Sequence, residues 1–247
     1  MTNNFWEEKL IQGYYDKVLK KGLKKNRGLQ AAWHHTIFLK SAKEISIDSL
    51  HLDIACGPGT FIGNYVNAKS TGIDIAEKQI QYAKKNYSNK GDFYESNIFL
   101  DNNYKKKFNV VSSIGLVEFL SEKEIKIFID DVVENKLKKN GYLILTTPNY
   151  NIVMRILGRL VNIFSPLSYE SVTITKFNKR NLQTLLDTLG YEYEIKKIVN
   201  LGIFLGVLNI GIAVKINDLI SKLIKYRYGF ILMAKIGKNK SSLSKYE

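Results

Sequence analysis

Short apolar runs alternate along the chain with stretches in which apolar residues recur at helical spacing. The strand-like runs lie near residues 51–55, 70–74, 92–95, 109–114 and 141–146. Helical spacing separates them, most clearly at residues 77–87 and 121–137, and Ser121 with Glu124 forms a capping box at the start of the second helix. Strands that alternate with helices in this way predict an α/β fold with a doubly wound, mostly parallel sheet.

The two ends of the chain add further elements to this pattern. Apolar spacing predicts helices at residues 5–25 and 28–45, which we expect to cap the core as a unit of residues 1–45. A third helix is predicted at 178–189, and strands at 191–199 and 228–235 complete a sheet that ends in an antiparallel hairpin. The main domain then covers residues 46–247, with insertions at about 150–170 and 200–226.

Both insertions are rich in apolar residues. Residues 150–166 carry charge only at Arg155 and Arg159, which share a helix face because they lie four residues apart. Residues 199–214 carry no charge, but this stretch is shorter than the roughly 20 residues that cross a bilayer. Two interpretations of the second stretch stay open: burial against the sheet, or a lid that lies in a membrane interface and admits a lipid-like molecule.

The residues with the clearest chemistry follow the first predicted strand. Residues 52–61 read as an apolar strand, a glycine turn and the start of a helix, and residues 72–75 end a second strand in an acid. Gly57 and Gly59 let a ligand approach the backbone, and Asp74 stands where a carboxylate accepts both hydroxyls of a ribose. This arrangement predicts a nucleoside-binding crevice.

A nicotinamide dinucleotide site is the competing interpretation of the glycine turn. Its fingerprint has a third glycine, at the position where this chain has Ile62. Asp53, just before the glycines, would repel a pyrophosphate but would receive an ammonium group. The turn therefore favours a nucleoside that carries an amino acid rather than a pyrophosphate.

The run from Leu52 to Gly59, the acid Asp74 and residues 109–114 resemble the class I S-adenosylmethionine-dependent methyltransferases. The similarity covers residues from about 45 to 150 and implies a Rossmann-like, seven-stranded sheet with S-adenosylmethionine as the cofactor. The residues that this resemblance implies in cofactor binding are Asp53, Ala55, Gly57, Gly59, Asp74, Ile75, Asn97, Ile98, Ile114 and Tyr14.

The later part of the chain is similar to the O-methyltransferases of ubiquinone biosynthesis. The similarity lies in the Thr-Pro-Asn run at 147–149, the apolar basic insertion, Pro166 and Phe177. Those enzymes act on prenylated phenols at a membrane surface and hold a divalent metal with an E-x-x-E-H motif. In the corresponding run, residues 115–119, only Glu118 remains, so we expect no metal site.

Methyl transfer to a hydroxyl requires a group that removes the proton. The candidate bases are His34, His35 and Glu118. The two histidines lie on the second predicted helix, in the N-terminal part that often closes over the donor in the family that the chain resembles, and histidine titrates in the useful range. A structural role for each histidine is the competing interpretation.

Composition narrows the choice of partners. The chain has 37 Lys and Arg against 23 Asp and Glu, and its net charge of +14 fits anionic partners, although a biased genome would produce the same excess. Enzymes that methylate the amines of bases have an Asn/Asp-Pro-Pro-aromatic run that residues 113–118 lack. The single cysteine, Cys56, belongs to the glycine turn, which excludes an internal disulfide framework and leaves no thiol for carbon methylation of pyrimidines. Nucleic acid is therefore not the expected substrate.

These patterns together predict a cytoplasmic S-adenosylmethionine-dependent methyltransferase. Its first residues lack the basic-then-apolar order of a secretory signal. The expected acceptor is the oxygen of a lipophilic or membrane-associated small molecule, with residues 150–166 touching an anionic membrane surface. A soluble sugar or polyketide-like acceptor, or a noncatalytic adenosyl-binding module, are the alternatives, and the sequence indicates no oligomeric state.

Overall fold

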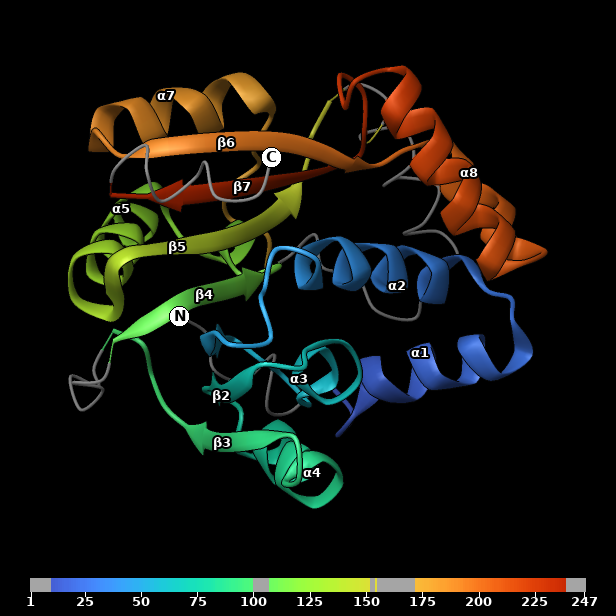
Figure 1. The fold of residues 1–247 in the computed structure, drawn as a ribbon, viewed down its shortest axis with the longest axis horizontal. Helices are drawn as coiled ribbons and strands as arrows, with labels where there is room; N and C mark the ends of the chain where they lie inside the picture. The colour runs from blue at the N-terminus through green and yellow to red at the C-terminus, as the bar shows by residue number, and fades with distance from the viewer. Residues whose placement is uncertain (1–9, 100–106, 152–153, 155–171, 239–247) are drawn as a thin grey trace.

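Among the residues that the computed structural model describes (10–99, 107–151, 154 and 172–238), seven strands form one sheet in the order β3-β2-β1-β4-β5-β7-β6 (Figure 1). The strands are β1 (Leu50–Ile54), β2 (Lys69–Asp74), β3 (Gly91–Glu95), β4 (Phe108–Ile114), β5 (Leu137–Pro148), β6 (Glu192–Val199) and β7 (Ile231–Gly237). The strands β1 to β5 pair in parallel, whereas β7 runs antiparallel to both β5 and β6. The predicted fold class, including its closing antiparallel hairpin, is confirmed.

The helices cover both faces of the sheet (Figure 1). They are α1 (Tyr14–Lys25), α2 (Leu29–Ala42), α3 (Thr60–Tyr65), α4 (Glu77–Tyr87), α5 (Glu122–Asp131), α7 (Lys179–Leu189) and α8 (Ile210–Leu223), with short turns of helix at η2 (Val117–Phe119), η3 (Val132–Lys136) and η4 (Leu201–Val207). One core cluster joins α5 and α7 to the sheet, and a second joins α2, η4 and α8 to its other face. Each face is therefore buried.

The central strands divide their side chains between these two clusters. In β5, Leu143 and Leu145 pack in the cluster with α5 and α7, while Tyr142 and Ile144 pack in the cluster with α2. Successive side chains of a strand point to opposite faces, so a strand covered on both sides is apolar throughout. This is why the central strands appear in the sequence as continuous apolar runs.

Two helix boundaries differ from the prediction. The helix expected from residue 5 begins only at Tyr14 in the described part of the chain, because Gly13 adopts a left-handed φ of 70° and caps the helix. A Cβ at Gly13 would lie 2.3 Å from the ring of Tyr82, so the turn needs glycine. The helix expected over 121–137 ends at Asp131 and continues as the π-helical turn η3, in which Val132 and Val133 both remain buried. The capping box of Ser121 and Glu124 is present.

The two predicted insertions have different outcomes. The basic apolar helix predicted at 150–166 lies almost wholly outside the described residues. The uncharged stretch 199–214 is divided among the end of β6, the 3₁₀ turns of η4 and the first turn of α8. No helix in the described ranges is long and apolar enough to cross a membrane.

Candidate active site

The glycine turn after β1 has the backbone that the sequence predicts. Ala55, Gly57 and Gly59 have φ values of 60°, 53° and 73°, and Gly59 is the N-terminal cap of α3. A Cβ on Gly59 would approach the ring of Phe93 to 2.8 Å, so this glycine permits close packing of the turn. A Cβ on Gly57 would meet nothing within 4 Å. The backbone at Gly57 therefore faces open space that a ligand would enter.

Asp74 at the end of β2 holds the turn in place. Its Oδ2 accepts a hydrogen bond from the Gly57 backbone N–H at 2.7 Å, and its Oδ1 accepts one from the Ala76 N–H at 2.9 Å. Burial raises the pKa of Asp74, while these backbone amides favour its charged form. The carboxylate is thus fixed at the edge of the sheet beside the glycine turn.

A cavity of about 470 Å³ opens at the carboxyl ends of β1, β2, β4 and β5, where open parallel sheets bind ligands. Six of the residues predicted to bind the cofactor line it: Asp53, Ala55, Gly57, Asp74, Ile75 and Ile114. A smaller cavity of about 60 Å³ shares Ala55, Asp74 and Ile75 with it and is also lined by Asn97 and Ile98. Eight of the ten predicted residues thus line one of these two cavities, and Gly59 lies in the adjoining turn without lining either.

Asp53 lies at the bottom of the main cavity and connects to a buried polar chain. Its Oδ1 is 2.5 Å from the Ser112 hydroxyl, which is 2.9 Å from His51 Nε2, and His51 Nδ1 is 3.0 Å from the Ser70 hydroxyl. Burial raises the pKa of Asp53 to about 7 and lowers the pKa of His51 to about 3. These hydrogen bonds link Asp53, Ser112, His51 and Ser70 in one buried series, which holds the Asp53 side chain in one orientation.

Glu118 faces the other side of the same cavity, in η2 after β4. Its Oε2 and the Thr147 hydroxyl are buried without a hydrogen-bond partner among the described residues. Burial raises the pKa of Glu118 to about 7; Thr147 lies close enough to favour the charged form, although no contact within hydrogen-bond limits joins the two. Such orphaned groups in a cavity mark a place where a ligand supplies the partner.

The two candidate histidines have different surroundings. His34 lines the cavity, and burial lowers its pKa to about 4. His35 is absent from the cavity lining, and its Nδ1 is 2.6 Å from the Tyr65 hydroxyl. His34 and Glu118 therefore line the same cavity, and His35 does not.

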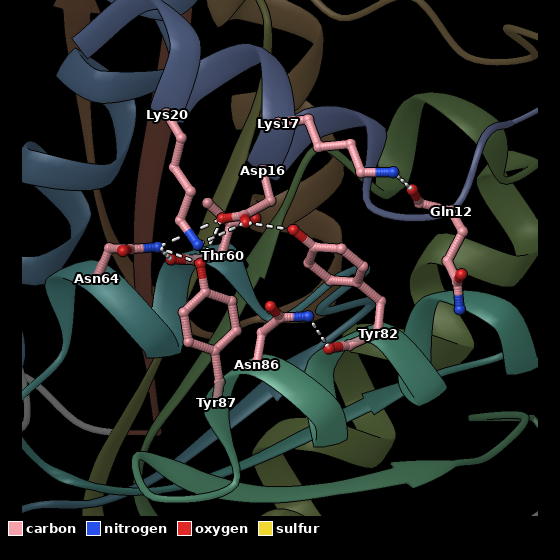
Figure 2. Close-up of polar contacts among 9 residues, drawn as sticks. All are labelled: Gln12, Asp16, Lys17, Lys20, Thr60, Asn64, Tyr82, Asn86 and Tyr87. Atoms are coloured by element: carbon pink, nitrogen blue, oxygen red, sulfur yellow. Dashed lines mark hydrogen bonds and ion pairs between the residues drawn. The ribbon is translucent and has the colours of Figure 1, made fainter. Parts of the chain in front are cut away.

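Helix α1 is fixed to α3 and α4 through a buried carboxylate. Figure 2 shows Tyr82 and Tyr87 pointing from α4 toward Asp16 on α1. Their hydroxyls donate to Asp16 at 2.8 and 2.5 Å, and Lys20 Nζ lies 2.9 Å from the same carboxylate. Asn64 of α3 donates to the Tyr87 hydroxyl at 2.8 Å. These contacts tie the N-terminal helix to the elements that follow β1 and β2.

The segment just before α1 covers the cavity. Gln79 Oε1 accepts from the Gly13 N–H at 3.0 Å, and its Nε2 donates to the Ile11 carbonyl at 3.3 Å. Leu10, Tyr15 and Gln79 all line the cavity. Gln79 was not predicted from the sequence, although a polar residue on the apolar face of the helix at 77–87 was a signal for it.

Tyr14 is not brought to the cavity, and Tyr15 stands there instead. Successive residues of a helix point about 100° apart, so only one of two adjacent tyrosines faces the site. Trp33 and Thr147 also line the cavity without having been predicted as site residues. Trp33 adjoins the predicted histidines, whereas Thr147 gave no sequence signal beyond its place at the end of a strand.

Residues 48–192 match the sequence family described as Methyltransferase domain. The chain belongs to this methyltransferase family. The prediction that the protein is a methyltransferase is therefore confirmed. A search of curated proteins found no match to the chain.

Solved methyltransferase structures share the fold of this family member at low identity. A SAM dependent methyltransferase from Archaeoglobus fulgidus superposes with a TM-score of 0.56 at 19% identity, over 84% of this chain and 94% of that chain. Magnesium protoporphyrin IX methyltransferase from Synechocystis PCC 6803, whose structure contains bound SAH, gives 0.56 at 12% identity over 94% and 100%. A small RNA methyltransferase gives 0.62 at 18% identity over 87% of this chain and 26% of its own.

The predicted cofactor, S-adenosylmethionine, agrees with the family and with the cofactor or product named for these structures. Their acceptors differ in chemistry, since one name specifies a porphyrin and another an RNA. The shared fold therefore leaves the acceptor to be argued from the site of this chain.

Proposed function

We propose that this methyltransferase transfers a methyl group from S-adenosylmethionine to an oxygen of a lipophilic, membrane-associated small molecule, with Glu118 as the general base. The observation that carries the proposal is the buried Glu118 carboxyl, which lines the cavity and whose Oε2 has no hydrogen-bond partner among the described residues. A hydroxyl of an acceptor would supply the missing hydrogen bond. The division into cap residues 1–45 and a catalytic domain of residues 46–247 is part of the same proposal.

The two sides of the cavity suit the two ligands. The nucleoside would lie over Asp74 and Ile75, with its adenine near Asn97 and Ile98 and its ammonium group at Asp53. Gly57 fits this assignment because its backbone faces open space, and Asp74 fits because its carboxylate is already fixed beside it. When bound, S-adenosylmethionine supplies a methyl group already activated as a sulfonium, so the protein has only to align the acceptor and remove its proton.

Glu118 suits the proton transfer better than the histidines do. A general base is most effective when its pKa lies near the working pH, and burial raises the pKa of Glu118 to about 7. The lowered pKa of His34, about 4, makes it a weak base, and His35 does not reach the cavity. In the described parts of the chain no group of three His, Cys, Asp or Glu side chains is arranged to hold a metal ion, and the proposed reaction uses none.

An apolar wall supports a lipophilic acceptor. Trp33, Phe38 and Phe119 line the cavity together with Ile174 and Ile231. A sugar would leave its hydroxyl groups without partners against such side chains, because buried polar groups need hydrogen bonds. Residues 113–118 lack the Asn/Asp-Pro-Pro-aromatic run of enzymes that methylate the amines of bases, which disfavours a nucleic acid acceptor. The tail's resemblance to the ubiquinone O-methyltransferases agrees with a phenolic acceptor, and cytoplasmic placement beside a membrane stays a prediction.

Methyl transfer from radiolabelled S-adenosylmethionine tests the proposal with three acceptors: a prenylated phenol, a monosaccharide and total RNA. We expect label in the phenol as an acid-stable methyl ether. Glu118→Gln should lower kcat by about 10² to 10⁴ while leaving donor affinity unchanged, because the base acts on the acceptor. His35→Gln, outside the cavity, serves as the matched control. Label in sugar or RNA, donor binding without turnover, or an unchanged kcat in Glu118→Gln would each contradict the proposal.

A further inference from the structure

Helix α8 buries two apolar residues in its first turns, Ile210 and Ala213, and two polar residues further along, Asn217 and Ser221. Asn217 and Ser221 are fully buried and are joined to Asn200 at the end of β6. Asn217 Oδ1 accepts from the Asn200 backbone N–H at 2.8 Å, and Asn200 Nδ2 donates to the Ser221 hydroxyl at 2.8 Å. These bonds satisfy the buried polar groups, so hydrogen bonds as well as apolar packing hold the helix against the sheet.

The opposite side of α8 is apolar and bare. Ile212, Leu219 and Leu223 are 53%, 54% and 73% exposed, and their spacing of seven and four residues places them on one face. A helix that only covered a sheet would carry polar residues on its outward face, not large apolar ones. The exposed apolar face therefore requires another explanation.

Four more exposed apolar side chains lie in and just after η4. Leu201, Leu205, Val207 and Leu208 are exposed there, and η4 packs against α8. We name these four residues, with Ile212, Leu219 and Leu223, the apolar ridge. The ridge holds seven of the thirteen large apolar side chains that are exposed in the described part of the chain. Such gathering on two packed elements marks an interaction surface rather than scattered surface residues.

The charges around the apolar ridge are positive. Lys215 and Lys222 are exposed between its residues on α8, and Lys225 and Arg227 follow. The only acid in residues 200–228 is Asp218, whose carboxylate lies 2.7 Å from Lys40 Nζ on α2. Because Asp218 pairs with Lys40, no acid within residues 200–228 is left to balance the Lys and Arg side chains around the apolar ridge.

Helix α1 brings further cations to the same end of the molecule. The carbonyl of Asn26 accepts from the Ile210 backbone N–H at 2.9 Å, which joins the end of α1 to the start of α8 (Figure 1). Lys24, Lys25 and Arg27 adjoin this contact in the chain and are exposed. Apolar side chains flanked by Lys and Arg are the combination that binds an anionic membrane interface.

We propose that the apolar ridge is a docking surface for an anionic lipid membrane, with the side chains of the ridge in the acyl boundary and the surrounding cations at the lipid headgroups. This inference rests on the proposed function, because the docked membrane would be the source of the lipophilic acceptor. Packed aromatic rings join η4 to the wall of the cavity. Phe204 in η4 packs on Phe230 with ring centroids 6.0 Å apart, and Trp33 of the cavity wall stacks on Phe230 at 5.9 Å.

Flotation of the purified protein with vesicles tests the docking surface. The vesicles are phosphatidylcholine alone and phosphatidylcholine mixed with phosphatidylglycerol. We expect the wild type to float with the anionic vesicles, less so in high salt, and to stay behind with the neutral ones. Leu219→Glu combined with Leu223→Glu should reduce recovery about tenfold, because it places charge in the acyl boundary. Ile127→Glu, an exposed apolar position on α5 on the other face of the sheet, should float as the wild type does.

Two outcomes overturn the docking surface: a wild type that fails to float, or a double variant that floats equally well. If the wild type instead forms a dimer in sedimentation velocity that the double variant abolishes, the ridge binds a second copy and the membrane proposal is wrong. Thermal unfolding of each variant verifies that it is folded. Methyl transfer to a detergent-dispersed prenylated phenol separates the two proposals, because loss of docking leaves that reaction intact whereas failure of the proposed function abolishes it.

Discussion

Two buried carboxyl groups face the same cavity in different surroundings. Asp53 is held by Ser112 and the polar chain behind it, whereas Oε2 of Glu118 is left without a partner among the described residues. A carboxylate that the protein holds in one orientation, such as Asp53, is suited to binding a positive group. A carboxyl oxygen without a partner, such as Oε2 of Glu118, is suited to accepting a proton from a bound ligand. Both roles were predicted from the sequence, Asp53 for an ammonium group and Glu118 as one of three candidate bases, and these contacts favour Glu118 among the three.

Glu118 should make the stability of the protein depend on pH. Its carboxyl has a pKa of about 7 in the folded state against an ordinary value of 4.5. The folded state therefore binds more protons between these values, so the free energy of unfolding falls as the pH rises through this window. Glu118→Gln removes the effect. In urea unfolding, the free energy of unfolding of the variant minus that of the wild type should rise by about 3 kcal/mol from pH 4 to pH 8.

Glu122→Gln, at an exposed position of α5, gives the background for that comparison. A constant difference in the free energy of unfolding between wild type and Glu118→Gln across the pH range would show that Glu118 is not buried as the structure has it.

Element by element, the strands and central helices could be predicted because their signals are local. Apolar runs gave β1 and β4 within about two residues, and the capping box of Ser121 marked the start of α5. The position of α1 over the cavity could not be predicted from local signals. Asp16 meets Tyr82 and Tyr87 across 66 and 71 residues of chain, and no local pattern links them. In α8 the buried Asn217 and Ser221 find their partner in Asn200, which lies outside the helix.

The buried Asp16 should determine how firmly α1 covers the cavity. Asp16→Ala leaves the hydroxyls of Tyr82 and Tyr87 and the ammonium group of Lys20 without their acceptor, at a cost of about 3 kcal/mol. Because Leu10 and Tyr15 line the cavity, donor binding should weaken as the helix loosens. Hydrogen exchange of the α1 amides and donor titration measure the two effects.

Asp48→Ala, an exposed acid before β1, is the control for this prediction. Unchanged exchange in α1 of the Asp16→Ala variant would mean that apolar packing alone holds the helix, and the cluster in Figure 2 would then have no part in covering the site.

At the scale of the whole molecule, the fold and the cofactor side of the site follow from the sequence more fully than the acceptor side does. Gly57, Gly59 and Asp74 belong to a turn whose backbone constraints appear directly in the residue types. The acceptor side is assembled from η2, α2, β5 and the segment near Ile174, which meet only after folding. The part that a side chain such as Thr147 plays in the site becomes clear only from the cavity that it lines in the folded protein.

Calorimetric titration of the purified protein with S-adenosylmethionine, its demethylated product and NAD shows which nucleoside the glycine turn and Asp74 bind. We expect binding of the first two and none of NAD. Asp74→Ala should weaken donor binding by about 1.5 to 3 kcal/mol, because it removes a charged acceptor of two hydroxyls, whereas Asp92→Ala, exposed on β3, should not. Tighter binding of NAD than of S-adenosylmethionine, or an unchanged donor affinity in Asp74→Ala, would contradict this expectation.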